Sequence, residues 1–150
     1  MGDAYKLLPF ANTLVEMDMS GAEIKLVLEE AIEYALQPDG SDGAFPYAAG
    51  LRWHVDSTRA SGNRLSKMEY KGRSDADWVP LNMEKMYRIV TNNYIAAGRD
   101  GYLSFKTVKD DGRFEDTYLD YAQSFVDYVK DRGSIAKLPF SEYSTQSFVK

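Results

Sequence analysis

Residues 8–24 read LPFANTLVEMDMSGAEI, and this stretch contains the two elements on which the fold depends. Apolar and acidic side chains alternate through VEMDM, which is the pattern of a strand with one buried face. Ser20 and Glu23 follow at the spacing of a capping box, in which each side chain binds a backbone N–H at the start of a helix. We therefore expect a half-buried strand that leads directly into an amphipathic helix over residues 21–36.

Helical and strand patterns continue on both sides of this stretch. Pro9 ends a short helical pattern at about Leu8, because the residue before a proline is pushed out of the helical region. The other expected elements are antiparallel strands at 48–56 and 65–72 around a turn at 61–63, an apolar central strand at 83–92, a strand or short helix at 102–108, a helix at 114–133 and a weakly patterned, partly mobile tail. This order predicts one α+β domain over residues 1–150, with a mixed sheet packed against helices.

The composition argues against several classes of function. The net charge of −5 is opposite in sign to that of most phosphate-backbone binders, so no nucleic-acid partner is expected. The sequence has no cysteine, and no apolar run approaches the ~20 residues of a membrane span. The single histidine, His54, lies in an alternating strand, and we expect it to be a partly packed strand residue and not a metal ligand.

Three stretches carry side chains beyond what packing requires. In LPFAN, Phe10 and Asn12 offer a ring and an amide, and in NNYIAAGRDGY, Tyr94 and Asp100 offer a ring and a carboxylate. In GAFPYAAG, the small residues up to Gly50 leave room for a backbone or a ligand. Each has a structural alternative: a core Phe with a turn-capping Asn, a glycine-rich turn, or tight helix–sheet packing. Two rings on opposite sides of a gap would enclose a planar base, which pairs Phe10 with Tyr94 as a hypothesis.

Three motifs, LPFANTLVEMDMSGAEI, GAFPYAAGLR and YRIVTNNYIAAGRDGY, resemble in order and spacing the C-terminal substrate-binding domain of the bacterial 5′-nucleotidase and UDP-sugar hydrolase family. The resemblance implies that Phe10 and Tyr94 clamp the base of a nucleotide or nucleoside. It further implies that Asn12 lies beside the base, that Asp100 binds the ribose, and that Gly50 supplies a backbone contact.

The same resemblance implies a separate metallophosphatase domain that holds two divalent metal ions and hydrolyses the phosphate. The metal-ligand motifs of that domain are absent from this sequence, so we expect no catalytic residue, no metal ligand and no cofactor within the chain itself. The expected partner is the catalytic domain of the same parent protein, and that parent is expected to be exported to the periplasm or the cell surface.

The sequence departs from the family pattern at several positions. The family usually has Gly-Gly-Asp-Gly where this chain has Gly98-Arg99-Asp100-Gly101, and we expect Arg99 to point to solvent in preference to a phosphate. The stacking ring is Tyr where Phe is commoner, PFAN replaces the commoner PFGN, and an upstream arginine segment is absent. The alternative function is a non-catalytic module that keeps the fold and uses its aromatic surface to hold a protein partner.

Overall fold

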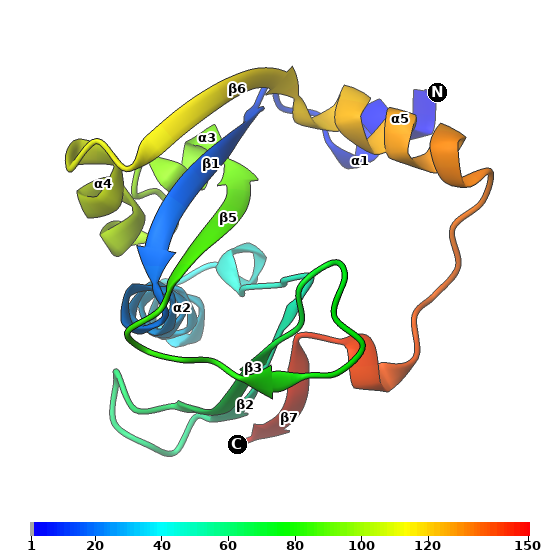
Figure 1. The fold of residues 1–150 in the computed structure, drawn as a ribbon. Coiled ribbons are helices and arrows are strands. Elements are labelled where there is room, and N and C mark those ends of the chain that lie inside the picture. The colour runs from blue at the N-terminus through cyan, green and yellow to red at the C-terminus, as the bar shows by residue number, and fades with distance from the viewer. Residues whose placement is uncertain (1) are drawn as a thin grey trace.

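The computed structural model describes the backbone of residues 2–150 and the side chains from residue 4 onward. Its helices are α1 (Gly2–Leu7), α2 (Gly21–Leu36), α3 (Asn93–Ala96), α4 (Leu103–Asp110) and α5 (Tyr121–Arg132), with short 3₁₀ helices η1 (Asp42–Ala44) and η2 (Phe140–Glu142). Its strands are β1 (Thr13–Ser20), β2 (Leu51–Asp56), β3 (Leu65–Tyr70), β4 (Val79–Pro80), β5 (Met86–Asn92), β6 (Phe114–Asp120) and β7 (Thr145–Val149) (Figure 1).

The strands form two separate sheets. One has three antiparallel strands in the order β5-β1-β6, and the other has four strands in the order β4-β3-β2-β7. In the four-stranded sheet β2 pairs antiparallel with β3 and parallel with β7, so this sheet is mixed. The α+β class predicted from the sequence is confirmed, and the antiparallel pairing of the strands around residues 61–63 is confirmed with it.

Helix α2 carries the core that joins the two sheets. Its apolar stripe packs with the buried face of β1 on one side and with side chains of β2 and β3 on the other, in one cluster that includes Val15, Met17, Met19, Ile24, Val27, Leu28, Ile32, Trp53, Val55, Leu65 and Met68. The predicted capping box is present, with the Glu23 N–H donating to Ser20 Oγ at 3.2 Å and the Ser20 N–H donating to Glu23 Oε2 at 2.8 Å. Strand β1 and helix α2 therefore form where the sequence predicts them.

A buried carboxylate fixes α2 to the second sheet. Glu29 is almost fully buried and accepts hydrogen bonds from the backbone N–H groups of Arg64 and Leu65 at 3.0 and 2.8 Å. Lys25, one turn earlier on the helix, supplies the counter-charge at 3.0 Å. Because a buried charge is costly unless it is paired and hydrogen-bonded, these contacts define where β3 begins against α2.

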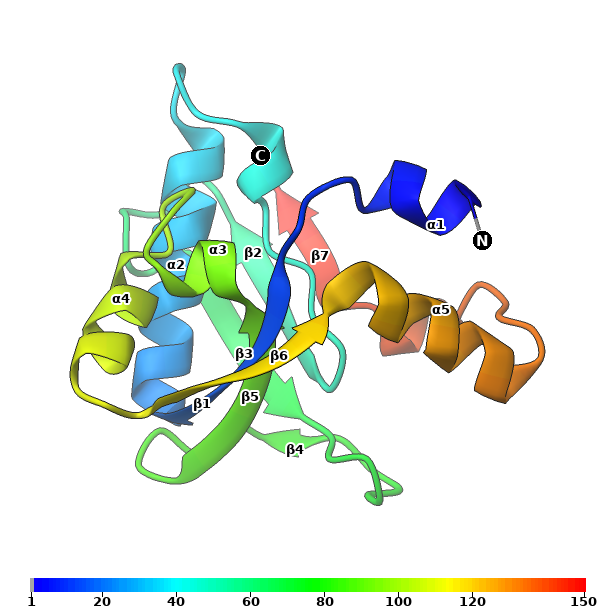
Figure 2. The same cartoon turned by 90° about the horizontal axis from the view of Figure 1, so that it is seen from above.

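Helices α1 and α5 lie beside each other, away from the α2 core (Figure 2). The Tyr5 hydroxyl on α1 donates to Gln123 Oε1 on α5 at 2.9 Å. From α5 an extended segment runs to η2 and β7, which returns the C-terminus to the edge of the four-stranded sheet (Figure 1). The last strand of the chain thus completes the sheet that lies farther from α5.

Several predicted elements are wrong in part. Residues 114–120, predicted as the first part of a long helix, form strand β6, because they pair with β1 and the helix starts only after the N-cap Asp120. The apolar strand predicted as central, β5, is an edge strand, and β1 is the central one. The tail, predicted as weakly ordered, contains η2 and β7. The segment left open between strand and helix is helix α4, and a short strand, β4, lies between β3 and β5 in the chain.

Candidate functional site

One end of the three-stranded sheet brings two of the predicted stretches together. Leu14 near the start of β1 pairs with Asn92 at the end of β5, so the loop before β1 and the helix after β5 leave from the same edge. The Thr13 N–H donates to Asn93 Oδ1 at 3.3 Å and ties the two segments directly. Phe10 and Asn12 precede this contact and Tyr94 follows it. The sheet register therefore places them at one end of the domain.

The loop before β1 is also fixed to α5. The Phe10 N–H donates to the Tyr121 hydroxyl at 3.3 Å, and the Asn12 carbonyl accepts from the Tyr121 N–H at 3.1 Å. These are backbone contacts of the loop, and they leave its side chains available. The Phe10 ring is 70% exposed, which excludes the alternative of a core phenylalanine, and Asn12 is half-buried with an amide that has no hydrogen-bond partner among residues 4–150.

Tyr94 and Asp100 contact each other directly. Asn92 caps α3 by accepting from the N–H groups of Tyr94 and Ile95, both at 3.0 Å, which sets the orientation of this short helix. The Tyr94 hydroxyl donates to Asp100 Oδ1 at 3.1 Å. This hydrogen bond, together with the negative charge of Asp100, raises the pKa of Tyr94 above its ordinary value.

The loop that carries Asp100 has a strained backbone. Asp100 has φ = 53° and lies between Gly98 and Gly101, whose φ angles are 81° and 83°. A positive φ is uncommon for a residue with a Cβ and is more often tolerated by Asp and Asn. Gly101 has a packing reason as well, since a Cβ there would lie 2.4 Å from Tyr34 Cβ on α2. The loop is therefore pressed against α2, and the backbone fixes the place of Asp100.

The electrostatic influence of Asp100 reaches the next aromatic residue. Burial, and secondarily the charge of Asp100, raises the pKa of Tyr102 to about 12. The Tyr102 hydroxyl donates to the Ala44 carbonyl at 3.0 Å. Arg99, between Gly98 and Asp100, is exposed, and its preference for solvent over a phosphate stays a prediction.

The ring of Tyr94 is 46% exposed, and within the described part of the chain neither it nor Phe10 stacks on another ring. Both predicted clamp residues thus keep ring surface open to solvent, at the end of the sheet where their segments meet. That the two rings enclose a base stays a prediction.

Gly50 lines a surface that the other four predicted site residues do not line. This surface is a cavity of about 580 Å³ between the two sheets, walled by α2, β5 and the 46–51 segment. Gly50 has φ = 73°, its carbonyl accepts from the Lys71 N–H at 2.9 Å, and a Cβ would lie 2.9 Å from the Lys71 carbonyl oxygen. Its small size therefore has a structural reason at the strand pair β2–β3.

Sequence reasoning missed this cavity. Its wall includes Tyr70 of β3, Tyr87 of β5, and Ile95 and Tyr102 from the segment after β5. Ile95 and Tyr102 belong to the same loop as Tyr94 and Asp100, so the loop presents one set of side chains to the cavity and another to the sheet end. The sequence signal for the cavity is the apolar alternation of β5, whose inward residues help to line it.

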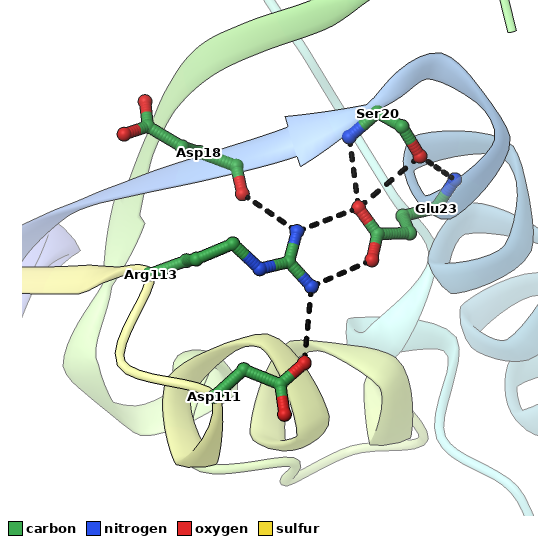
Figure 3. Close-up of polar contacts among 5 residues, drawn as sticks. All are labelled: Asp18, Ser20, Glu23, Asp111 and Arg113. Carbon is green, nitrogen blue, oxygen red and sulfur yellow. Dashed lines mark hydrogen bonds and ion pairs between the residues drawn. The ribbon is translucent and has the colours of Figure 1, made fainter. Parts of the chain in front are cut away.

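The opposite end of β1 holds a dense ionic network around Arg113 (Figure 3). Its guanidinium donates to both carboxylate oxygens of Glu23, at 2.9 and 2.7 Å, to the Asp18 carbonyl at 3.1 Å and to Asp111 at 3.2 Å. The hydrogen bond from Arg113 is the main cause that lowers the pKa of Glu23 to about 2, with the Ser20 N–H and hydroxyl adding to it. This cluster joins β1, α2, α4 and β6, and its polar groups satisfy one another.

Residues 4–150, whose side chains the structure describes, include no group of three or more His, Cys, Asp or Glu side chains placed to hold a metal ion. His54 is half-buried in β2, with Nδ1 2.7 Å from Ser147 Oγ, as expected for a packed strand residue. The pair of metal ions implied by the family resemblance therefore has no ligand set in this part of the chain. Within the same residues, no helix is long and apolar enough to cross a membrane.

A family model described as the 5′-nucleotidase C-terminal domain matches residues 1–109. The chain belongs to this family. The 5′-nucleotidase domain seen here is 43% identical over 151 residues to the NAD 5′-nucleotidase of Haemophilus influenzae, covering 99% of this chain and 24% of that protein. It is 44% identical over 129 residues to a probable 5′-nucleotidase of Treponema pallidum, covering 85% of this chain and 21% of the relative.

Solved structures agree with the family assignment. The NAD nucleotidase of H. influenzae superposes with a TM-score of 0.89 at 38% identity, over 99% of this chain and 26% of that one. A 5′-nucleotidase precursor from Thermus thermophilus superposes with a TM-score of 0.81 at 36% identity, over 99% of this chain and 27% of that one. The 5′-nucleotidase domain thus spans about a quarter of the length of these relatives.

Proposed function

We propose that this 5′-nucleotidase C-terminal domain holds the base and the ribose of a nucleotide. The observation that carries the proposal is the β1–β5 register with the Thr13–Asn93 hydrogen bond, which bring the loop of Phe10 and Asn12 and the helix of Tyr94 to one end of the β5-β1-β6 sheet, with Asp100 bonded to Tyr94. Two rings, an amide and a carboxylate are the groups that a nucleoside needs: faces for its base, a donor and acceptor for the base edge, and an acceptor for its hydroxyls.

Each group has a separate task in this proposal. Phe10 and Tyr94 stack on the two faces of the base, where each ring contact contributes about 1–3 kcal/mol and tolerates different bases. Asn12 binds the edge of the base, and Asp100 accepts hydrogen bonds from the ribose. Gly50 lines the cavity between the sheets, which the other four residues do not line. Its part in this proposal is therefore limited to a backbone contact.

Hydrolysis, in this proposal, takes place on a catalytic domain of the same parent protein that lies outside this sequence. That domain would hold the two divalent metal ions, and the parent would act in the periplasm or at the cell surface. The residues here bind and orient the nucleoside and do not cleave the phosphate. The 150-residue chain alone is therefore expected to leave AMP intact even with added divalent metal.

The proposal is tested by the affinity of the chain for adenosine, measured by NMR titration on wild type, Phe10→Ala and Tyr94→Ala. Loss of one stacking contact should weaken binding about 5- to 100-fold in each variant. Phe140→Ala is a matched control, because Phe140 is 60% exposed like Phe10 but lies on η2, beside the other sheet. Unchanged affinity in both clamp variants, or equal loss in the control, would contradict the proposal.

A further inference from the structure

The Tyr94–Asp100 hydrogen bond gives the Tyr94 hydroxyl a role distinct from stacking. A phenylalanine at this position would present the same ring face to a base, so the hydroxyl is not required for the stack. The hydroxyl instead binds Asp100 Oδ1 at 3.1 Å, six residues along the chain. Among residues 4–150, Asp100 Oδ2 has no hydrogen-bond partner.

The surroundings of Asp100 restrict where its carboxylate can lie. Its backbone is held at φ = 53° between two glycines of positive φ, and Gly101 is packed against Tyr34. The following helix α4 is anchored on α2, because Ser104 donates to Glu30 through its N–H at 2.8 Å and its hydroxyl at 2.7 Å. With the backbone fixed at both sides, the remaining freedom of Asp100 is the rotation of its side chain, and the Tyr94 hydroxyl restrains that rotation.

We infer that the Tyr94 hydroxyl is a positioning group for ribose recognition: it holds Oδ1 of Asp100 and leaves Oδ2 free to accept hydrogen bonds from the ribose diol. The inference rests on the proposed function and deepens it. One residue then joins the two parts of the ligand, with its ring on the base and its hydroxyl on the carboxylate that binds the sugar. The ligand class that follows is a ribonucleotide or ribonucleoside, selected over its deoxy analogues.

The raised pKa of Tyr94 agrees with this role, because the phenol must stay protonated to donate to Asp100. A carboxylate that already accepts one hydrogen bond also loses less side-chain entropy when a ligand binds. The benefit should therefore be confined to ligands that use the carboxylate, and a base that lacks the ribose hydroxyls should gain nothing from the Tyr94 hydroxyl.

The test compares adenosine with 2′,3′-dideoxyadenosine on wild type and Tyr94→Phe, by NMR titration of the 150-residue chain. Tyr94→Phe should weaken adenosine binding about three- to tenfold, as expected for the loss of one net hydrogen bond, and should change dideoxyadenosine binding less than about twofold. Tyr128→Phe on α5 is the matched control, since Tyr128 is 51% exposed and its hydroxyl makes no hydrogen bond within residues 4–150.

A double-mutant cycle separates positioning from a direct contact of the hydroxyl with the ligand. Asp100→Asn alone should remove the preference for adenosine, and Tyr94→Phe added to Asp100→Asn should cost no more than Asp100→Asn alone. Equal weakening of both nucleosides by Tyr94→Phe, or no change in either, would overturn the inference while the proposed function stands. Absence of adenosine binding by wild type would overturn both.

Discussion

The two ends of strand β1 differ in how their polar groups are satisfied. At the Ser20 end, Arg113 donates to the Glu23 carboxylate, the Asp18 backbone carbonyl and the Asp111 carboxylate, so these groups have partners within the domain (Figure 3). At the Thr13 end, Asp100 has a single hydrogen bond from Tyr94 and a strained backbone, and the nearby Phe10 ring is 70% exposed. The same strand thus has one end whose polar groups bond one another and one end whose rings stay exposed and whose carboxylate keeps an unpartnered oxygen.

Under the proposed function, the Thr13 end of β1 is the end that binds the nucleoside. Exposed rings and a backbone in a sparsely populated region cost stability, and they persist only when the surrounding structure determines them. Here the determining contacts come from α2, which packs under the Asp100 loop and is capped at its other end by the Arg113 network. The Ser20 end of β1 therefore supports the Thr13 end, because both ends contact helix α2.

The largest expected effect contrasts two glycines, one at each end. Gly101→Ala would force a Cβ to within 2.4 Å of Tyr34 Cβ at a φ of 83°, and should lower the free energy of unfolding by about 3 kcal/mol. Gly112, beside Arg113, has a similar φ of 77°, but a Cβ added there would meet nothing within 4 Å, so Gly112→Ala should cost only about 1 kcal/mol. Urea unfolding of both variants measures the difference, and equal losses would contradict the packed state of the Asp100 loop.

The next effect contrasts two arginines at the Ser20 end. Arg113→Ala removes a two-pronged contact with Glu23 and the bond to the Asp18 carbonyl, and should lower the free energy of unfolding by about 2 kcal/mol. Arg88→Ala breaks ion pairs with Glu16 and Asp18, but the Arg88 side chain is 60% exposed, so its loss should cost clearly less than the loss of Arg113. Denaturant midpoints should rank the two variants in this order, and the reverse order would show that the Arg113 network does not stabilise the fold as described.

The smallest expected effect is the pH dependence of the stability that Glu23 contributes at the Ser20 end of β1. The pKa of Glu23 is about 2 in the folded chain against an ordinary 4.5, so its contribution to stability is complete above pH 4.5 and is lost as the pH falls toward 2. Because Glu23 and Arg113 are each about one-third exposed, solvent screening limits the loss to about 1 kcal/mol. The free energies of unfolding of wild type and Glu23→Gln should differ more at about pH 5 than at about pH 2.5. The same difference in unfolding free energy at both pH values would contradict the ionic role of Glu23.

The elements with local signals were predictable, and those fixed by distant pairing were not. The capping box of Ser20 and Glu23 defines where β1 ends and α2 begins, and its hydrogen bonds are those the spacing predicts. Strand β6 was not predicted, because the pattern of residues 114–120 continues that of the following helix and only their pairing with β1 makes them a strand. Strand β7 pairs in parallel with β2 across about 90 residues of chain, which leaves no local pattern.

The residues of the candidate site also divide into those with a local sequence signal and those whose contacts depend on the folded chain. The pairing of Phe10 with Tyr94 was predicted from their rings and from the family resemblance, and the register between β1 and β5 brings the two strand ends beside them together. The contact between Tyr94 and Asp100 depends on the positive φ of Asp100, which the spacing alone does not specify. Gly50 is grouped with them by the family resemblance, and in the structure its small size also serves the close approach of the Lys71 carbonyl.

Nucleoside binding at the Thr13 end of β1 is tested most directly by a ¹H–¹⁵N NMR titration of the chain with adenosine, read residue by residue. We expect shifts concentrated in residues 10–13 and 93–102, with the Arg113 network unaffected. Shifts centred on residues 18–23 and 111–113 would contradict a nucleoside site at the Thr13 end, as would no shift at all up to millimolar adenosine.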